Sequence, residues 1–481
     1  MKSNSSQRIA VGMFMNGKSV RIALVNPPYP PGVVRHPPSV PIGLGYLAAV
    51  AEKNGHAVSV IDCLPVDMDY NEMKKQVAAF DPDIIGITST TSTFPSALQA
   101  AHVLKESCPN ALTVLGGPHV TFMDTSTLSE CPDVDAVVRR EGEETLLDLA
   151  RCVANEKKLD EVAGITFRKN GKIVQMPDRP LIQNLDELPF PALKHFPLSK
   201  YQIFGKTYLP IITSRGCPFR CSFCVSSRMV GNTLRARSPK NVVDELEWLK
   251  NVHGAEAFVF YDDILTFDKK RIYDICDEIK NRKIGLPWDC TTRVDQVSRE
   301  LLAKMREANC QEVFFGVESG CQRILDKVHK KTSIELNEKA IKWAKEAGLF
   351  VAISVIIGYP GETRDTLKQT LDFVRRMKAD DVYLSVAMPF PGTELRTLVE
   401  KMGWKMTSDW THYDTMTPVF EDPDLPSEEI ANTRRKFYDS FYSPRYILRQ
   451  TVKGYLKGNF YSRIMVRTAL NHLIWRIRST F

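Results

Sequence analysis

The sequence predicts an α/β protein: an N-terminal Rossmann-like domain, then a partial (β/α)6 barrel, then a helical basic C-terminal segment. Short β-branched apolar runs alternate with helical patterns in the first third of the chain, and six similar units follow residue 208. The proline-rich stretch LDELPFPALKHFPL, at residues 185–198, separates the two series. We expect the domains at 20–160 and 201–400, joined by a hairpin and linker at 161–200 and followed by an extension at 401–481.

The first series begins with the buried strand VRIALVN, which ends at the proline-rich loop PPYPPG. Further strands are predicted at 57–62, 83–89, 111–117 and 136–140. Helical patterns lie at 43–55, 71–80, 94–107 and 143–155. This alternation implies a parallel sheet with helices on both faces, and ligands of such sheets bind over the carboxyl ends of the strands.

The second series has strands at YLPIITSR, AFVFYDD, WDCTT, EVFFGVES, FVAISVIIG and DVYLSVAM. Helical patterns follow at 239–252, 269–283, 299–308, 334–347 and 364–377. Six units are too few for a closed eight-stranded barrel, so we expect a partial one. Its catalytic residues should lie at the carboxyl ends of the strands.

The composition is that of a soluble globular protein, with 481 residues, 43% hydrophobic and 25% charged. Eight of its 11 cysteines lie singly along the sequence, which favours a reducing cytoplasm over a secreted disulfide framework. The N-terminus lacks the apolar core of a signal peptide. The longest apolar run, Phe350 to Ile357, is far too short to cross a membrane. We therefore expect a cytoplasmic protein.

Positive charge is concentrated at the C-terminus. Residues 434–481 hold 11 Lys or Arg and one acid, a net charge of +10, whereas the whole chain carries +7. Within this segment one helical face would carry Val466, Leu470, Leu473 and Ile477, with Arg467, Asn471 and Arg478 opposite. A basic amphipathic helix of this kind is typical of peripheral contact with an anionic membrane. The alternative is a helix packed on the barrel or on a partner.

Three cysteines stand close together in SRGCPFRCSFC, at Cys217, Cys221 and Cys224, with Phe223 before the last. The spacing is too tight for well-formed disulfides among them. A structural zinc site normally takes four protein ligands, and no fourth Cys or His is near. Three thiolates on one loop suit a cubane iron–sulfur cluster with one iron left open. The loop follows the first barrel strand, where barrels place chemistry.

This C-x3-C-x2-C loop resembles the signature of the radical S-adenosylmethionine (SAM) superfamily. The resemblance implies that the three cysteines hold a [4Fe-4S] cluster whose open iron binds SAM. Further matching stretches are FYDD, GVESG, IIGYPGET and PFPGTEL. They imply SAM-binding roles for Phe223, Asp262, Asp263, Glu318, Gly358 and Glu362. Either aspartate could instead cap a loop or helix, and Glu318 could be a solvated carboxylate instead of a ribose ligand.

The N-terminal half resembles the cobalamin-binding (B12-binding) domain of the anaerobic Mg-protoporphyrin cyclase-like branch, the class B radical SAM methyltransferases. The motifs are PPYPPG, PIGLGYLAA, GGPHVTF, RREGEET and LDELPFPAL. Residues expected near cobalamin are Pro28, Ser89, Thr90, Gly116, Gly117, Thr121, Glu141 and Glu143. The glycines could alternatively form a simple turn, and at least one of the two glutamates could cap a helix.

One departure concerns the cobalt ligand. The D-x-H-x-x-G motif of methionine-synthase-type domains is absent, because the first strand runs into Asn26 and two prolines. We therefore expect no histidine below the cobalt, although His36 and His119 lie near the expected site. Arg215 and Arg220 flank the cysteine loop, where they could ease cluster reduction or lie in solvent.

The resemblance implies a cobalamin-dependent radical SAM enzyme, with C-methylation at an unactivated carbon as the expected reaction. A cyclase or oxidative rearrangement without methyl transfer is the alternative, and a non-catalytic cobalamin or iron–sulfur sensor is the alternative of another class. A flavodoxin- or ferredoxin-like electron donor is the expected partner. Nucleic acid is not expected, because no RNA-binding domain is visible. The substrate stays open among lipid, tetrapyrrole, protein side chain and metabolite.

Overall fold

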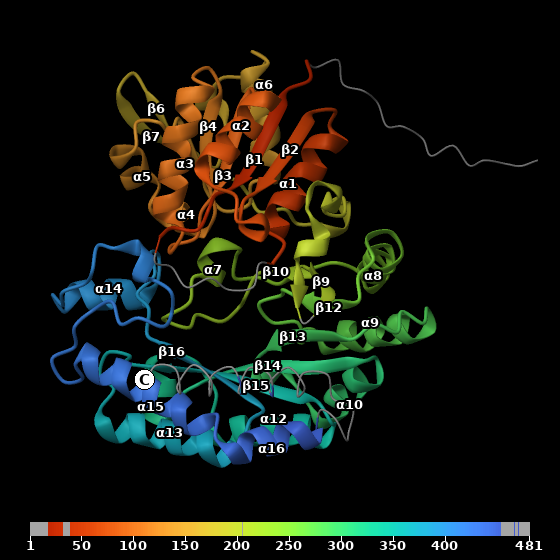
Figure 1. Ribbon diagram of the computed structural model, residues 1–481, viewed down its shortest axis with the longest axis vertical. Helices are drawn as coiled ribbons and strands as arrows, with labels where there is room; N and C mark the ends of the chain where they lie inside the picture. The colour runs from red at the N-terminus through yellow and green to blue at the C-terminus, as the bar shows by residue number, and fades with distance from the viewer. Residues whose placement is uncertain (1–17, 32–38, 204, 454–465, 467–469, 471–481) are drawn as a thin grey trace, which may run out of the picture.

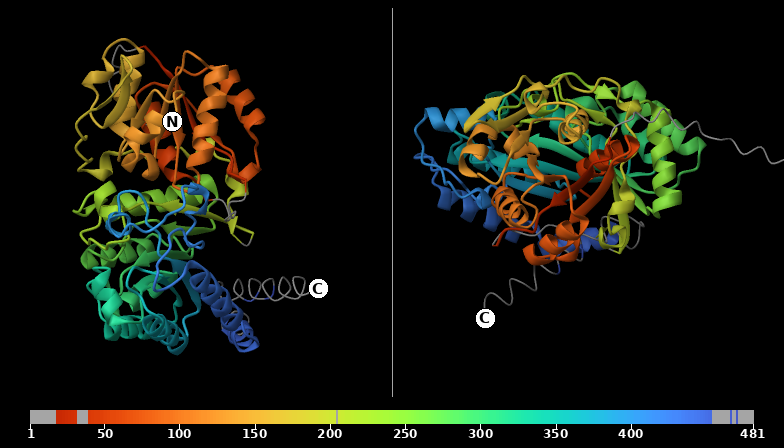
Figure 2. Two further views of the ribbon diagram at one scale, coloured as in Figure 1. Left: turned by 90° about the vertical axis from the view of Figure 1, so that its left-hand side faces the viewer. Right: turned by 90° about the horizontal axis from the view of Figure 1, so that it is seen from above.

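The computed structural model describes residues 18–31, 39–203 and 205–453, together with Val466 and Leu470. Two α/β domains are stacked, with the cysteine loop region between them (Figure 1). The two further views show the same stacking from the side and from above (Figure 2). The predicted α/β architecture is confirmed.

The first sheet has seven strands in the order β2-β1-β3-β4-β5-β6-β7. Its parallel strands are β1 (Arg21–Asn26), β2 (Ala57–Asp62), β3 (Ile84–Thr88), β4 (Leu112–Gly116) and β5 (Ala136–Val138). The hairpin expected between the domains forms β6 (Ile165–Lys169) and β7 (Lys172–Gln175) and pairs antiparallel with β5. The first sheet therefore continues past residue 160, to Gln175.

Helices cover both faces of this sheet because the strand residues that point to either face are apolar. Ile22 and Leu24 belong to the core on one face, whereas Ala23 and Val25 belong to the core on the other. The first core includes α1 (Ile42–Lys53) and α6 (Glu143–Val153). The second includes α2 (Tyr70–Phe80), α3 (Phe94–Ser107), α4 (Pro118–Phe122) and α5 (Asp124–Glu130). The carboxyl ends of β1, β3 and β4 are left for a ligand.

The second sheet has the order β16-β15-β14-β13-β12-β9-β8, in which only β8 (Gln202–Ile203) is antiparallel. Its parallel strands are β9 (Lys206–Ile211), β12 (Ala257–Phe260), β13 (Trp288–Thr292), β14 (Cys310–Glu318), β15 (Phe350–Ile357) and β16 (Asp381–Val386). The sheet does not close on itself, because its two edge strands, β16 and β8, do not pair with each other. This is the expected partial (β/α)6 barrel.

The barrel helices match the expected positions to within two residues at each end. They are α8 (Pro239–His253), α9 (Lys269–Asn281), α10 (Arg299–Glu307), α12 (Ile334–Glu346) and α13 (Arg364–Met377), with the short α11 (Gln322–Lys327) after β14. The predicted first barrel strand is divided. β9 stops at Ile211, and β10 (Ser214–Arg215) pairs with β11 (Arg235–Ala236), so that this small ladder brackets the cysteine loop.

The proline-rich linker packs into the protein. Leu193, Phe196 and Tyr201 are buried in an apolar cluster that runs from β1 into the barrel strands. The Tyr201 hydroxyl also donates a hydrogen bond to Asp62 at the end of β2. This continuous core fixes one domain against the other.

The chain after the barrel forms α14 (Glu394–Lys401), the 3₁₀ turn η7 (Trp410–His412), α15 (Ser427–Phe441) and α16 (Pro444–Thr451). Tyr438 of α15 bonds to the backbone of Val382 and Leu384, so this helix covers the open edge of β16. The amphipathic helix expected from Val466 to Ile477 lies outside the described residues, apart from Val466 and Leu470. None of the helices in the described part of the chain is long and apolar enough to cross a membrane.

Candidate two-cofactor site

The cysteine loop starts from a rigid anchor. Asp262, at the end of β12, is 2% exposed and accepts hydrogen bonds from Thr213 N (2.6 Å), Thr213 Oγ1 (2.5 Å) and Ser214 Oγ (2.6 Å). Gly216 then turns at φ 103°, where a Cβ would lie 2.1 Å from the Thr233 carbonyl oxygen. Only glycine fits there. Asp262 thus holds the loop, and its acceptors are already used by the protein.

The three thiols lie half-buried on this loop. Burial raises the pKa of the Cys217 thiol to about 11 and raises that of Cys221 above its ordinary value. Cys221 and Cys224 line a cavity of about 240 Å³, together with Arg220, Arg228 and Glu394. Three thiols on one loop, two of them lining this cavity, fit the donor set of a cluster, and metal binding would deprotonate them. Among the described residues, no three Cys, His, Asp or Glu side chains are grouped to hold a single metal ion.

Asp263 and Phe223 are the predicted SAM contacts nearest the cysteines. The Asp263 side chain is exposed, and Ser226 Oγ donates to it over 2.8 Å. Desolvation nevertheless raises the pKa of Asp263; the hydrogen bond from Ser226 opposes this effect, and the charge of Asp262 adds to it. Phe223 packs against the buried cluster around Tyr359. Of the two predicted aspartates, Asp263 is therefore the one that is open to a ligand.

Glu318 ends β14 in an uncommon backbone conformation, with φ 68°, beside a register shift in the ladder with β15. Its carboxylate accepts from Lys330 Nζ (2.7 Å) and Ser354 Oγ (2.9 Å), and it is 6% exposed. A Cβ at Gly316 would lie 2.5 Å from Glu318 Oε1, so that glycine makes room for the carboxylate. A residue held in this strained state at a strand end is typical of a functional site.

Gly358 and Glu362 form the turn after β15. The Gly358 backbone N–H donates to Glu362 Oε2 over 2.6 Å, and Glu362 is fully buried. Its other oxygen, Oε1, has no hydrogen-bond partner among the described residues. Desolvation raises the pKa of Glu362 to about 7. The structure therefore places Glu362 inside the turn and away from any open space.

Most of the residues predicted near cobalamin lie together at the carboxyl ends of β3 and β4. Ser89 N donates to the Gly116 carbonyl (2.9 Å), and Thr121 Oγ1 donates to the Gly117 carbonyl (2.9 Å). A Cβ at Gly117 would lie 2.4 Å from the Ser89 carbonyl oxygen, whereas one at Gly116 would meet nothing closer than 4.0 Å. This edge is thus made largely of backbone, with no side chain at Gly116 or Gly117 to keep a ligand away. Thr90 is exposed there, and Pro28 is buried after β1.

His119 lies at the same edge, sandwiched between Phe94 (4.1 Å between ring centroids) and Trp410 (4.8 Å). It is 1% exposed, and neither ring nitrogen has a hydrogen-bond partner among the described residues. Desolvation lowers its pKa to about 4, so the ring is neutral at physiological pH. His36 lies outside the described residues.

Glu141 and Glu143 join the two domains. Arg215 donates to Glu141 Oε1 (3.0 Å) and to Glu143 Oε1 (2.6 Å), and Arg235 reaches Glu141 at 2.9 Å. All four side chains are at most 11% exposed. Burial alone would lower the pKa of Arg215, but the two carboxylates raise it overall. We call these four residues the interdomain ion network.

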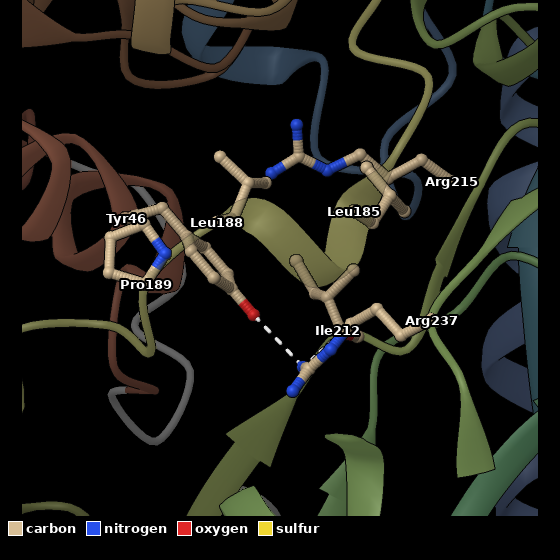
Figure 3. Close-up of a pocket in the computed structure, with 7 residues that line it drawn as sticks. All are labelled: Tyr46, Leu185, Leu188, Pro189, Ile212, Arg215 and Arg237. Carbon is tan, nitrogen blue, oxygen red and sulfur yellow. Dashed lines mark hydrogen bonds between the residues drawn. The ribbon is translucent and has the colours of Figure 1, made fainter. Parts of the chain in front are cut away.

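The surroundings of this network are shown in Figure 3. The Arg215 guanidinium lies over the ring of Tyr46 from α1, 5.6 Å from its centroid, and Arg237 Nη1 lies 3.5 Å from the Tyr46 hydroxyl. Burial raises the pKa of that hydroxyl, and the charge of Glu245 adds to the effect. The cavity at this point measures only about 10 Å³, so the junction is closely packed.

Two cations near the cysteines were not expected from the sequence. Arg293 follows β13 with its Nη1 atom 3.7 Å from Cys221 Sγ, and Lys330 pairs with Glu318. Trp410, beside His119, was also missed. Each comes from a segment far along the chain, so no local spacing connects it to the motifs. The pattern TTRVD after a strand was the one available signal for Arg293.

Comparison with known proteins agrees with this geometry. The family model of the radical SAM superfamily matches residues 211–374, and that of the B12 binding domain matches residues 32–150. An uncharacterized methyltransferase of Pyrococcus horikoshii is 36% identical over 454 residues, which cover 92% of this chain and 99% of that protein. The anaerobic magnesium-protoporphyrin IX monomethyl ester cyclase of Rubrivivax gelatinosus is 31% identical, covering 87% of this chain and 79% of the cyclase.

Among solved structures, the cobalamin-dependent S-adenosylmethionine radical enzyme OxsB, with aqua-cobalamin and S-adenosylmethionine bound, matches with a TM-score of 0.73 at 19% identity. The match covers 95% of this chain and 75% of OxsB. At this identity the likeness shows the shared fold.

Fold and site together define an enzyme with a cobalamin domain stacked on a partial barrel that carries a cluster loop. The chain belongs to the radical SAM superfamily, in the branch whose members carry an N-terminal B12-binding domain. Its cofactors are a [4Fe-4S] cluster, S-adenosylmethionine and cobalamin. The expectations of fold, family and cofactors are confirmed.

Removing one partner of the interdomain ion network should lower the free energy of unfolding. Arg215→Met leaves the Glu143 carboxylate buried without its cation, and breaking a buried pair in this way costs about 3–5 kcal/mol. We expect a lower thermal unfolding midpoint and reduced iron loading, since Arg215 precedes Cys217 by two residues. The double variant with Glu143→Gln should recover part of the loss. As a control, Arg299→Met removes an exposed arginine and should change neither quantity. A wild-type midpoint and iron content in Arg215→Met would contradict the assignment.

Glu362 should make stability depend on pH. The folded state keeps a proton that the unfolded chain releases near the ordinary value of 4.5, so stability falls as pH rises from about 4.5 to about 7. The contribution at full deprotonation is up to about 3 kcal/mol. Glu362→Gln should therefore gain in unfolding midpoint over the wild type between pH 5 and pH 8, whereas the exposed control Glu428→Gln should follow the wild type. Parallel pH profiles for wild type and Glu362→Gln would refute this explanation.

Proposed function

We propose that the enzyme methylates an unactivated carbon of its substrate. The observation that carries the proposal is the apposition of the two cofactor sites. Arg215, at the start of the cluster loop, is bonded directly to Glu141 and Glu143, which follow β5 of the cobalamin domain. When bound, the cluster with S-adenosylmethionine supplies a 5′-deoxyadenosyl radical for hydrogen abstraction, and methylcobalamin supplies the methyl group.

The chain's own residues would bind and orient these groups. Cys217, Cys221 and Cys224 would hold the cluster, and the exposed Asp263 would accept from the amino group of S-adenosylmethionine. Glu318 has both oxygens engaged by Lys330 and Ser354, so a ribose contact would share these acceptors. At the cobalamin edge, Thr90 and the backbone at Gly116 are open to the corrin ligand.

Four residues that the sequence predicts at the cofactors have contacts that fit structural roles better. Asp262 anchors the loop, Glu362 closes a turn, and Glu141 with its neighbour Glu143 joins the domains. Their influence on the cofactors would act through positioning of the loops that bind them.

The alternative reaction is a cyclisation or oxidative rearrangement without methyl transfer, which the cyclase relative at 31% identity favours. The methyltransferase relative is closer, at 36% identity and nearly complete coverage of both chains. A methyl-transfer reaction is therefore the better supported of the two. The chemical class of the substrate remains among lipid, tetrapyrrole, protein side chain and small metabolite.

Product analysis separates the two reactions. The full-length enzyme is reconstituted anaerobically with cluster, cobalamin, S-adenosylmethionine and a reductant, and candidate substrates are added. Methylation should yield S-adenosylhomocysteine together with 5′-deoxyadenosine in each turnover. If 5′-deoxyadenosine accompanies a converted substrate and no S-adenosylhomocysteine forms, the reaction is of the cyclase type.

The ligand assignment predicts the behaviour of a triple cysteine variant. Replacing Cys217, Cys221 and Cys224 by Ala should remove the cluster's visible absorption and all 5′-deoxyadenosine formation. Cobalamin binding should persist, since its edge is built from β3 and β4. Cys152→Ala, a half-buried thiol of the first domain, is the control and should keep full iron. A full four-iron content in the triple variant would rule the assignment out.

An electron donor of the flavodoxin or ferredoxin type would reach the cluster through the cavity at Cys221 and Cys224. Its rim carries the exposed Arg220 and Arg228, whose charge suits an acidic protein surface. Glu394 also lines the cavity and carries the opposite charge to the two arginines. Its carboxylate lies 3.7 Å from His329 Nδ1. This opening leads from solvent to the thiols of Cys221 and Cys224.

We place the enzyme in the cytoplasm, with peripheral contact to an anionic membrane through its basic C-terminus. The support is the charge of +10 in residues 434–481. Each basic residue near an anionic leaflet contributes about 1 kcal/mol of binding free energy. At ordinary salt this attraction is largely screened beyond about 10 Å.

Deleting residues 454–481 tests this contact without touching α15 or α16. The shortened chain should no longer sediment with vesicles that contain phosphatidylserine at low salt, and its cofactor loading should stay unchanged. High salt should weaken the binding of the full chain in the same way. Equal sedimentation of the two chains, or none for the full chain at low salt, would argue for a soluble substrate.

A further inference from the structure

Arg293 contacts the cysteine loop at two points. It follows β13, is 4% exposed, and directs Nη1 to within 3.7 Å of Cys221 Sγ. Its guanidinium carbon also lies 3.6 Å from the ring centroid of Phe219, in the same loop. One side chain from a neighbouring strand thus touches the loop through a sulfur and through an aromatic face.

The rest of the guanidinium is fixed by other partners. Nε and Nη2 donate to the two oxygens of Asp295 at 2.9 Å each, and Nη2 also donates to the Lys330 carbonyl at 2.6 Å. A bidentate fork of this kind sets the plane of the group. With Nε and Nη2 engaged, Nη1 is left to face the thiol.

Two buried cations lie on this side of the loop: Arg293 at the Cys221 sulfur, and Lys330, whose backbone carbonyl accepts from Arg293. Lys330 is bonded to Glu318, which offsets its charge. Arg293 is likewise paired with Asp295, but its Nη1 donor lies between that pair and the sulfur.

We propose that Arg293 raises the reduction potential of the cluster by presenting a positive N–H donor to Cys221. The proposal rests on the assignment of Cys217, Cys221 and Cys224 as cluster ligands. One-electron reduction adds a negative charge to the cluster. A buried cation bonded to a ligand sulfur stabilises the reduced form more than the oxidised form. Arg293 is therefore a positioning and electrostatic residue, and it need not touch substrate.

The test is the midpoint potential of the full-length, reconstituted enzyme without S-adenosylmethionine, titrated with dithionite and followed by the paramagnetic resonance of the reduced cluster. Arg293→Gln removes the charge and should lower the ratio of reduced to oxidised cluster about tenfold at a given potential, a shift of about 59 mV for one electron. Arg293→Lys keeps the charge but loses the bidentate fork, so its midpoint potential should lie between those of the wild type and Arg293→Gln. Arg299→Gln, an exposed arginine six residues on, should match the wild type.

A second variant moves the potential in the opposite direction. Asp295→Asn keeps the guanidinium but removes its counter-charge, so the potential should rise. An unchanged potential in Arg293→Gln at full iron and sulfide content would overturn the proposal. If Arg293→Gln fails to hold a cluster, an unchanged or lower potential in Asp295→Asn would overturn it instead. A failed ligand assignment shows separately, as iron retained in the triple cysteine variant.

Discussion

The arrangement of the two cofactor sites depends on the buried ion pairs from Arg215 to Glu141 and Glu143. Arg215 belongs to the ladder that brackets the cluster loop, and both carboxylates follow the last parallel strand of the cobalamin domain. Any rotation of one domain on the other would separate charges that are almost fully buried. Since an unpaired buried charge costs several kcal/mol, the relative orientation of the two sites is strongly restricted.

A second set of contacts fixes the loop within the barrel. Asp262 receives three hydrogen bonds from Thr213 and Ser214, so the first residues of the loop are tied to the neighbouring strand. Ser222, between two of the cysteines, shares a hydrogen bond of 2.7 Å with the Tyr359 hydroxyl in the turn after β15. The loop that bears the thiols is thus held from the end of β12 and from the turn after β15, which orders it before any metal binds.

The sequence predicts the fold well because both domains are built from local strand–helix units whose periodicity is plain. It also places the thiols and the Ser89 to Thr121 edge, since these follow strands directly. It cannot tell which carboxylate of a motif faces a ligand. Asp262 and Asp263 are adjacent in FYDD, yet one is saturated by backbone and hydroxyl donors while the other is exposed. Such differences arise from partners distant in sequence, as with Arg293 and Lys330.

Ion pairs and apolar packing have different roles at the domain junction. The cluster of Leu193, Phe196 and Tyr201 removes apolar surface from water and is non-directional, so it can stabilise contact without selecting one orientation. The ion network gains little net energy, because desolvation offsets the attraction, but its geometry tolerates only one alignment. In the proposed reaction, a substrate radical generated at the barrel would have to meet the methyl group held by the cobalamin domain at short range. For that task the alignment supplied by Arg215 matters more than the strength of the contact.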